Sequence, residues 1–228
     1  MPTGLVIPAA GSGRRFGGSG PKQLEVLAGR PVLVRSIEPF LERVDDIVVV
    51  VNSAIRDTVA AIIAQEPWAQ RCRLVEGGDC RRDSVHNGLL ALQSGCTWAL
   101  VHDAARPLVT TAVIDACLAA LHHHPAVVAA IPCNDTLKRV DEHPVITATV
   151  SRQGLWRAQT PQGLRLEQAL PAFAQAKRED WDVTDDVSVL ERAGCVSAIV
   201  ADSPRNLKIT LPDDLALAEA LLHLSTGA

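Results

Sequence analysis

Short, nearly unbroken apolar runs recur along the chain, and they limit its fold more than any other feature. They lie at residues 5–8, 47–51, 73–75, 99–101, 127–131 and 198–200. Runs of this length without polar alternation are typical of strands that are buried on both faces. Segments with apolar residues at helical spacing separate or follow them, at residues 32–42, 55–65, 84–92, 112–122, 166–176 and 211–224. This alternation predicts an α/β fold with a mostly parallel, doubly wound sheet.

One stretch departs from that alternation. Residues 135–140 and 145–150 are rich in β-prone side chains and flank a polar turn that contains Pro144, which predicts a β-hairpin. Both faces of this hairpin are too polar for a core, so we expect a protruding arm, at residues 135–160, that contacts another subunit. A solvent-exposed hairpin is the alternative, although an isolated hairpin is only marginally stable in water. No second domain boundary is visible, so residues 1–228 are expected to form a single domain.

Charge and composition disfavour several classes of function. The 22 basic and 26 acidic side chains leave a formal net charge of -4, which provides no global positive field for nucleic acid. Four Trp, three Phe and no Tyr offer few surfaces on which bases could stack. No segment approaches the roughly 20 apolar residues that cross a bilayer. Neither a secretion signal nor a Cys-x-x-Cys pair is present, so we expect reduced cysteines and a cytoplasmic location.

A glycine-rich loop follows the first apolar run, at the edge where open α/β sheets bind ligands. Residues 8–23 read PAAGSGRRFGGSGPKQ. Small residues let backbone N–H groups approach an anion, while Arg14, Arg15 and Lys22 supply positive charge. The loop lacks the endings of a Walker loop and of a dinucleotide-binding motif. It predicts a polyphosphate site, with a plain flexible turn as the alternative.

Asp103 lies just beyond the apolar run at residues 99–101. Mg²⁺ prefers one or two carboxylates together with substrate phosphate oxygens, so Asp103 opposite a phosphate loop is a candidate ligand. A helix cap or turn residue is the alternative.

Two other segments carry candidate contacts. Gly77 and Gly78 would let backbone groups meet the edge of a base, and Ser84 could add a hydrogen bond, although Ser84 and Asp83 could simply cap a helix. Lys208 lies in an apolar stretch before the last helical segment, and a buried lysine is rare without a partner.

Other polar residues favour structural roles. His122 to His124 suit a helix C-terminus, and Asp185 with Asp186 suit the first turn of a helix. Ser12 lacks the G-x-S-x-G setting of a serine nucleophile.

Taken in order, these motifs resemble the 2-C-methyl-D-erythritol 4-phosphate cytidylyltransferases of isoprenoid biosynthesis, over nearly the whole chain. The segments that carry the likeness are PAAGSGRR with PKQ, GGDCRRDS, VHDAARP, DTLK, Arg152 before LW, QTPQ, TD at residues 184–185 and NLK at 206–208. Leu24 departs from the pattern, since an aromatic residue commonly follows the PKQ segment.

The resemblance implies a Rossmann-like nucleotidyltransferase that dimerises through the arm and joins CTP to methylerythritol phosphate with Mg²⁺. It implies three groups of contacts. For the CTP phosphates these are Ala9, Ala10, Gly11, Gly13, Arg15 and Lys22; for cytosine and ribose, Gly78, Asp79 and Ser84; for metal and alcohol, Asp103. Around the second substrate it implies Arg106, Thr136, Arg152, Thr160, Thr184 and Lys208, of which Thr136, Arg152 and Thr160 would reach the neighbouring subunit's site.

The chemistry of that reaction agrees with the charged residues. A phosphate monoester has its second pKa near about 6, so the attacking oxygen is already ionised at neutral pH and needs no general base. Catalysis must bring two anions together and neutralise charge, and we assign that task to Arg15, Lys22, Lys208 and Mg²⁺. A ribitol 5-phosphate cytidylyltransferase and a non-catalytic nucleotide-binding regulator remain as alternatives. The sequence alone does not rank cytosine against uracil.

Overall fold

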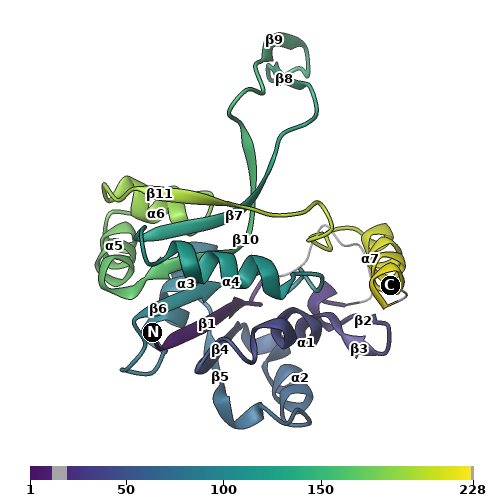
Figure 1. Cartoon of the computed structure of the whole chain (residues 1–228), viewed down its shortest axis with the longest axis vertical. Coiled ribbons are helices and arrows are strands. Elements are labelled where there is room, and N and C mark those ends of the chain that lie inside the picture. The colour runs from purple at the N-terminus through teal and green to yellow at the C-terminus, as the bar shows by residue number, and fades with distance from the viewer. Residues whose placement is uncertain (12–19, 227–228) are drawn as a thin grey trace.

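The computed structural model describes residues 1–11 and 20–226, and these residues form a seven-stranded central sheet with strand order β11-β7-β10-β6-β1-β4-β5 (Figure 1). The strands are β1 (Thr3–Pro8), β4 (Asp46–Val51), β5 (Cys72–Glu76), β6 (Trp98–Val101), β7 (Ala126–Pro132), β10 (Trp156–Arg165) and β11 (Ser197–Ala201). Neighbouring strands are parallel except where β10 pairs antiparallel with β6 and β7. The predicted mostly parallel sheet is confirmed.

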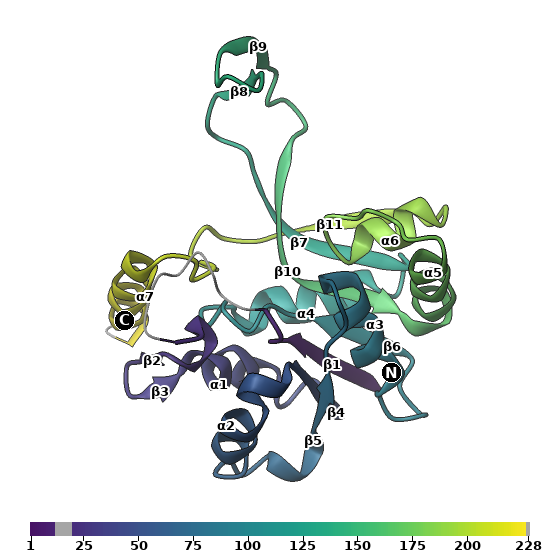
Figure 2. The ribbon, with the colours of Figure 1, turned by 180° about the vertical axis from the view of Figure 1, so that it is seen from behind.

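Helices cover both faces of this sheet (Figures 1 and 2). They are α1 (Val32–Ile37), α2 (Ser53–Ile63), α3 (Arg81–Leu90), α4 (Thr111–Ala120), α5 (Leu166–Arg178), α6 (Val187–Arg192) and α7 (Pro212–Thr226), with 3₁₀ turns η1 (Lys22–Leu24), η2 (Glu38–Phe40) and η3 (Ala69–Arg71). Side chains of a strand alternate between faces, so Leu5 and Ile7 pack with α1, α2 and α4, whereas Val6 packs with α3, α5 and α6. Two buried layers therefore enclose the sheet, as the doubly wound prediction requires.

Two helix predictions differ from the structure by three residues or more at one end, and the others by at most two. The segment predicted at 32–42 is helical only to Ile37 and continues as η2, because Pro39 has no N–H to extend the α-helical bonding. The segment predicted at 84–92 starts earlier, at Arg81, with Cys80 as N-cap. Ser84 and Asp83 therefore lie inside α3, and the alternative that they cap this helix is wrong.

The arm leaves the sheet between β7 and β10 and projects well beyond it (Figures 1 and 2). Its tip pairs β8 (Leu137–Val140) with β9 (Ile146–Val150) in antiparallel register. Side chains from 151 to 158 are still exposed, but Gln159 and Thr160 are buried within β10. The predicted boundary at residue 160 is thus too late, because β10 has already re-entered the body.

Small elements complete the fold. A short hairpin, β2 (Val26–Leu27) with β3 (Arg30–Pro31), follows η1, and α7 packs beside it. Among the described residues, none of the helices has the length and apolar character that crossing a membrane would need.

Gly88 lies where α3 packs on β1 and β4. A methyl group added there would lie 2.4 Å from Cγ1 of Val6 and 2.9 Å from Cγ2 of Val50. Both valines are fully buried and cannot move without disturbing the core. We expect Gly88→Ala to lower the free energy of unfolding by about 1–3 kcal/mol despite the better helix propensity of alanine, as measured by urea unfolding.

Gly95→Ala is the matched control, because nothing lies within 4 Å of a methyl group added at that position. Its free energy of unfolding should stay within about 0.5 kcal/mol of the wild type. Equal stability of the Gly88 variant and the wild type would contradict this packing.

Candidate active site

A cluster of charged side chains lies at the carboxyl ends of the parallel strands, centred on Asp103. The Asp103 carboxylate, only 8% exposed, follows β6 by two residues. Of the described side chains, three cations contact it: Arg81 Nη1 at 2.8 Å, Lys208 Nζ at 2.9 Å and Arg106 Nε at 3.2 Å. These cations come from α3, from the segment before α7 and from the loop after β6. The fold thus brings together charges that are far apart in sequence.

Arg81 also connects Asp103 with a second buried carboxylate. Its Nη2 donates to Oδ2 of Asp186 at 2.7 Å, and Asp186 lies at the start of α6. These five described side chains comprise three cations and two carboxylates, and Asp185 and Asp202 add negative charge nearby. Guanidinium and ammonium groups gathered in this way suit a phosphate group.

The cations hold Asp103 in its ionised form. Burial by itself would raise the pKa of Asp103, but Arg81, Lys208 and Arg106 together lower this pKa below its usual range. Burial raises the pKa of Asp186, and the adjacent Arg81 opposes that shift. The ion pair with Asp186 in turn raises the pKa of Arg81.

A buried chain of hydrogen bonds fixes the loop that carries Asp103. The backbone N–H of Asp103 donates to Oγ1 of Thr160 at 3.0 Å, and that hydroxyl lies 2.9 Å from Nδ1 of His102. Nε2 of His102 lies 3.1 Å from the carbonyl oxygen of Arg106, which can only accept. His102 is therefore neutral with its proton on Nε2, and the Thr160 hydroxyl donates to Nδ1. This residue positions the loop and is not placed to act as an acid or base.

Lys22 lies beside the segment that carries Lys208. Its Nζ donates to the carbonyl oxygen of Ile209 at 2.7 Å. Lys22 therefore lies close to the segment that carries Lys208, as a common phosphate site for these two predicted cations needs. The predicted site residues Gly13 and Arg15, together with Arg14, lie outside the described residues.

The start of the glycine-rich loop is tied down through its carbonyl oxygens. Gln23 Nε2 donates to the carbonyl oxygen of Ala9, and Asn52 Nδ2 donates to that of Ala10, at 2.7 and 2.8 Å. Gly11 is exposed. The loop thus leaves β1 with its first carbonyl groups bound by side chains.

The second glycine segment packs directly on that loop. A methyl group on Gly77 would lie 2.7 Å from Cβ of Ala10, and one on Gly78 would lie 2.4 Å from Cβ of Asp83. Ser84 Oγ accepts from the backbone N–H of Gly78 at 3.1 Å. Packing therefore requires both glycines, and Ser84 braces the segment. Asp79, next in the chain, is exposed.

Thr160 is placed differently from the expectation. Its side chain is only 3% exposed and bonds His102 and Asp103 of its own chain, so the expected reach to a neighbouring subunit's site is wrong. By contrast, Thr136 and Arg152 are exposed on the arm, where Arg152 donates to the carbonyl oxygen of Asn134. Thr184 is exposed in the loop before α6.

Sequence reasoning gave no site role to Arg81 or Asn206, although both lie in segments that carry the resemblance, and it missed the pairing of Asp186 with Arg81. Asp185 does bond the first turn of α6, since its Oδ1 accepts from the N–H of Ser188 at 3.0 Å. The prediction that these two acids stabilise the first turn of a helix therefore holds for Asp185, whereas the side chain of Asp186 pairs with Arg81. The available signal was the charged pair Arg81-Arg82 directly after the glycine segment.

The described residues do not form a complete metal site. None of their His, Cys, Asp and Glu side chains gather in groups of three or more that could hold an ion. Both oxygens of Asp103 already accept from cations. The donor set fits Mg²⁺ only as one carboxylate beside phosphate oxygens, an arrangement that Mg²⁺ commonly accepts.

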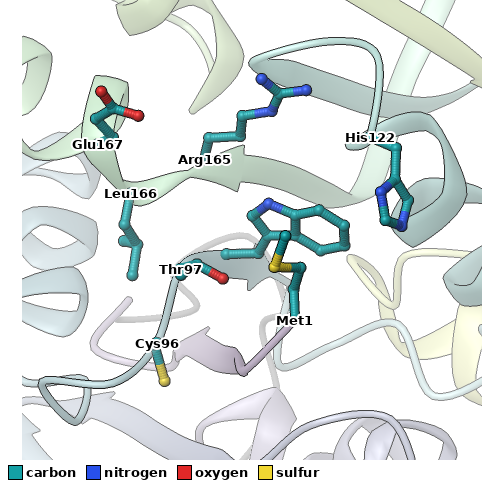
Figure 3. Close-up of a pocket in the computed structure, with 8 residues that line it drawn as sticks. Met1, Cys96, Thr97, His122, Arg165, Leu166 and Glu167 are labelled. Carbon is teal, nitrogen blue, oxygen red and sulfur yellow. The ribbon is translucent and has the colours of Figure 1, made fainter.

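A cavity of about 490 Å³ lies at the end of β6 that is opposite to Asp103, where this strand begins (Figure 3). It is lined by Met1, Cys96, Thr97, Trp98, His122, Arg165, Leu166 and Glu167. Trp98 begins β6, whereas Asp103 follows the end of that strand. This cavity is therefore separate from the charged cluster.

His102 should make stability depend on pH. Burial lowers the pKa of His102 from 6.5 to about 4, so the unfolded chain binds this proton more readily. The contribution is complete above about pH 6.5 and is lost as the pH falls toward 4. It amounts to about 3 kcal/mol, since one pKa unit is about 1.4 kcal/mol. Urea unfolding between pH 7 and 4 should show this loss, and His102→Asn should reduce it.

His123→Asn serves as the control, because His123 is an exposed histidine just after α4. That variant should keep the pH dependence of the wild type. An unchanged dependence in the His102 variant would refute a neutral, buried His102.

Comparisons with known proteins identify the family of this chain. The family model described as 2-C-methyl-D-erythritol 4-phosphate cytidylyltransferase matches residues 3–224. A relative of that name from Prochlorococcus marinus (strain MIT 9313) is 43% identical, over 96% of this chain and 98% of its own length. A second, from Symbiobacterium thermophilum, is 42% identical, over 98% of this chain and 94% of its own length.

Solved structures match as well. The crystal structure of 2-C-methyl-D-erythritol 4-phosphate cytidylyltransferase from Thermus thermophilus matches with a TM-score of 0.80 at 30% identity, covering 98% of this chain and 100% of that one. The crystal structure of 4-diphosphocytidyl-2C-methyl-D-erythritol synthase from Anaerococcus prevotii matches with a TM-score of 0.84 at 26% identity, covering 97% and 98%. The chain therefore belongs to the 2-C-methyl-D-erythritol 4-phosphate cytidylyltransferase family.

Proposed function

We propose that the Asp103 cluster is where this chain transfers the cytidylyl group of CTP to 2-C-methyl-D-erythritol 4-phosphate. The products are 4-diphosphocytidyl-2-C-methyl-D-erythritol and pyrophosphate, in the non-mevalonate route to isoprenoids. Family membership supports the reaction. The observation that supports its location is the gathering of Lys208 and Arg106 on Asp103, with Lys22 beside them.

The transfer itself needs charge compensation more than proton transfer. An oxygen of the methylerythritol phosphate attacks the α-phosphorus of CTP, and the bond from that phosphorus to the oxygen of the β-phosphate breaks. The attacking phosphate is largely ionised at neutral pH, because its second pKa is near about 6. The fixed cations lower the repulsion between the two substrates and stabilise the charge that builds up at the α-phosphorus.

Arg106 and Lys208 differ in how far their side chains are exposed. Arg106 is 10% exposed, and its guanidinium group bonds both Asp103 and the carbonyl oxygen of Asn206. Lys208 is 38% exposed, so its ammonium group can turn toward an incoming phosphate. We assign Lys208 to bridging the two substrates, and Lys22 with Arg15 to the transferring phosphoryl group.

The loops beside the cluster would hold CTP. Gln23 and Asn52 bind the carbonyl oxygens of Ala9 and Ala10, which keeps these oxygens from facing a triphosphate. In this proposal Ala9, Ala10, Gly11 and Gly13 contact the phosphates of CTP. The segment with Gly78, Asp79 and Ser84 contacts cytosine and ribose. Arg106 and Thr184 would surround the second substrate. Thr160 would contribute indirectly, because it positions Asp103.

We include Mg²⁺ in the proposal with a limited contact to the protein. Asp103 would hold it only by sharing an oxygen that now accepts from Lys208 or an arginine, so most ligands would be phosphate oxygens and water. When bound, the ion supplies additional positive charge to the phosphates of CTP.

We further propose a cytoplasmic homodimer joined through the arm. The arm exposes apolar side chains, among them Val145, Ile146 and Trp156, which an isolated chain would leave in water. Thr136 and Arg152 would then reach the site of the neighbouring subunit.

The reaction is tested by release of pyrophosphate. The chain with CTP, Mg²⁺ and methylerythritol phosphate should release pyrophosphate faster than with ATP, GTP or UTP, and faster than with ribitol 5-phosphate. Lys22→Ala and Lys208→Ala should each lower kcat by at least about 100-fold, because each removes a cation from the reacting phosphates.

Lys177→Ala is the control for those variants, since Lys177 is exposed on α5. It should keep wild-type kcat. Faster turnover with ribitol 5-phosphate would favour the ribitol enzyme, no pyrophosphate would favour a nucleotide-binding regulator, and near-normal kcat in both lysine variants would overturn the assigned site.

The shared site is tested by mixing inactive chains. Arg152→Ala and Lys208→Ala should each be nearly inactive, and their heterodimers should regain activity because one of the two sites then has both wild-type residues. Co-expression with two affinity tags would isolate the heterodimer for the assay.

A mixture of Lys22→Ala with Lys208→Ala is the control, because both residues lie in the body of one chain and no intact site can form. Recovery in this control, or none in the Arg152 mixture, would contradict a site shared through the arm.

A further inference from the structure

We propose that Asn206 is the positioning residue that sets Lys208 and Arg106 on Asp103. The inference rests on the proposed cytidylyl transfer and assigns to it a residue outside the charged cluster. Asn206 is only 2% exposed, so its role is to organise the site rather than to touch substrate.

The side chain of Asn206 closes a turn and fastens it to β10. Nδ2 donates to Oδ2 of Asp202 at 2.6 Å and to the carbonyl oxygen of Thr160 at 2.8 Å. The backbone N–H of Asn206 donates to the carbonyl oxygen of Ser203 at 3.1 Å, within the same turn. The amide group therefore joins the segment after β11 to the strand that carries Thr160.

The backbone of Asn206 holds the buried arginine. Its carbonyl oxygen accepts from Arg106 Nη1 at 2.7 Å and from Gln159 Nε2 at 3.0 Å. Arg106 also contacts Asp103 through Nε, so its guanidinium group is held from two directions. Movement of Asn206 would shift this group relative to Asp103.

The backbone of Asn206 also starts the strap, which we define as residues 206–209. At the other end of the strap, the N–H of Ile209 donates to the carbonyl oxygen of Ala105 at 2.8 Å, and the carbonyl oxygen of Ile209 accepts from Lys22 at 2.7 Å. Lys208 lies between these two anchored residues. Its ammonium group reaches Asp103 because the strap is fixed at both ends.

The site uses the donor half of this amide and not the acceptor half. Oδ1 of Asn206 is buried and has no hydrogen-bond partner among the described residues, whereas Nδ2 has two acceptors. Aspartate would keep the shape of the side chain, lose the donor and place a negative charge against Asp202. Asn206→Asp therefore isolates the donor.

The test compares kcat, KM and structure in Asn206→Asp. We expect kcat to fall by about 100-fold, because small displacements of positioned groups have effects of that size. The KM for CTP should change much less, by about threefold at most, since most of its proposed contacts lie outside the strap, in the glycine-rich loop and at Gly78, Asp79 and Ser84. A crystal structure of the variant should show Lys208 Nζ displaced from Asp103.

A paired variant separates positioning from general destabilisation. Asn206→Asp combined with Asp202→Asn restores a donor facing an acceptor between residues 202 and 206, but not the bond to the carbonyl oxygen of Thr160. We therefore expect kcat to rise about tenfold above that of Asn206→Asp, without reaching the wild-type value. Asp202→Asn alone, a milder change, should lower kcat severalfold, and it carries the test if Asn206→Asp does not fold. Gln175→Glu is the control, because on α5 it likewise removes an amide that donates to a carboxylate, and it should keep wild-type kcat.

Wild-type activity decides first whether the proposed reaction holds. With an active wild type, unchanged kcat in both Asn206→Asp and Asp202→Asn would overturn the role of Asn206 alone. Recovery of the melting temperature without recovery of kcat in the paired variant would overturn it as well.

Discussion

The buried carboxylate of Asp103 is the interaction on which the rest of the site depends. Removing a carboxylate from water costs several kcal/mol unless cations and hydrogen bonds compensate for it, and Arg81, Arg106 and Lys208 do so here. Each comes from a different part of the chain, so their common contact joins α3, the loop after β6 and the strap. The site is therefore complete only when these three segments are in place.

The same contacts explain why the site favours anions. The cations already contact a carboxylate, so a phosphate group meets donors whose directions are set before it arrives. Arg81 and Arg106 are each held by a second partner, Asp186 and Asn206, whereas the ammonium group of Lys208 is bound through Asp103. Rigid arginines with one adjustable lysine suit a reaction in which the charge moves from the attacking phosphate to the departing pyrophosphate.

The sequence predicted those parts of the fold that depend on local pattern. Strands such as β4, apolar on both faces, were visible because every position is buried, and Lys208 stood out in an apolar stretch. β10 was not visible, since Pro161 and two glutamines interrupt its apolar run. Nor were the partners of Arg81, because contacts across 22 and 105 residues leave no local signal. For the same reason Thr160 was assigned to the arm although β10 carries it into the body.

The strap shows how one short segment serves both the core and the site. Along the strap, the side chains alternate between two environments. Leu207 and Ile209 pack with Leu27 and Val32 in the small apolar cluster near α7, whereas Asn206 and Lys208 face the charged groups. Burial of the apolar pair thus determines which way the polar pair points. A lone lysine in an apolar stretch is therefore not an exception to the hydrophobic pattern, because the pattern itself directs the ammonium group to Asp103.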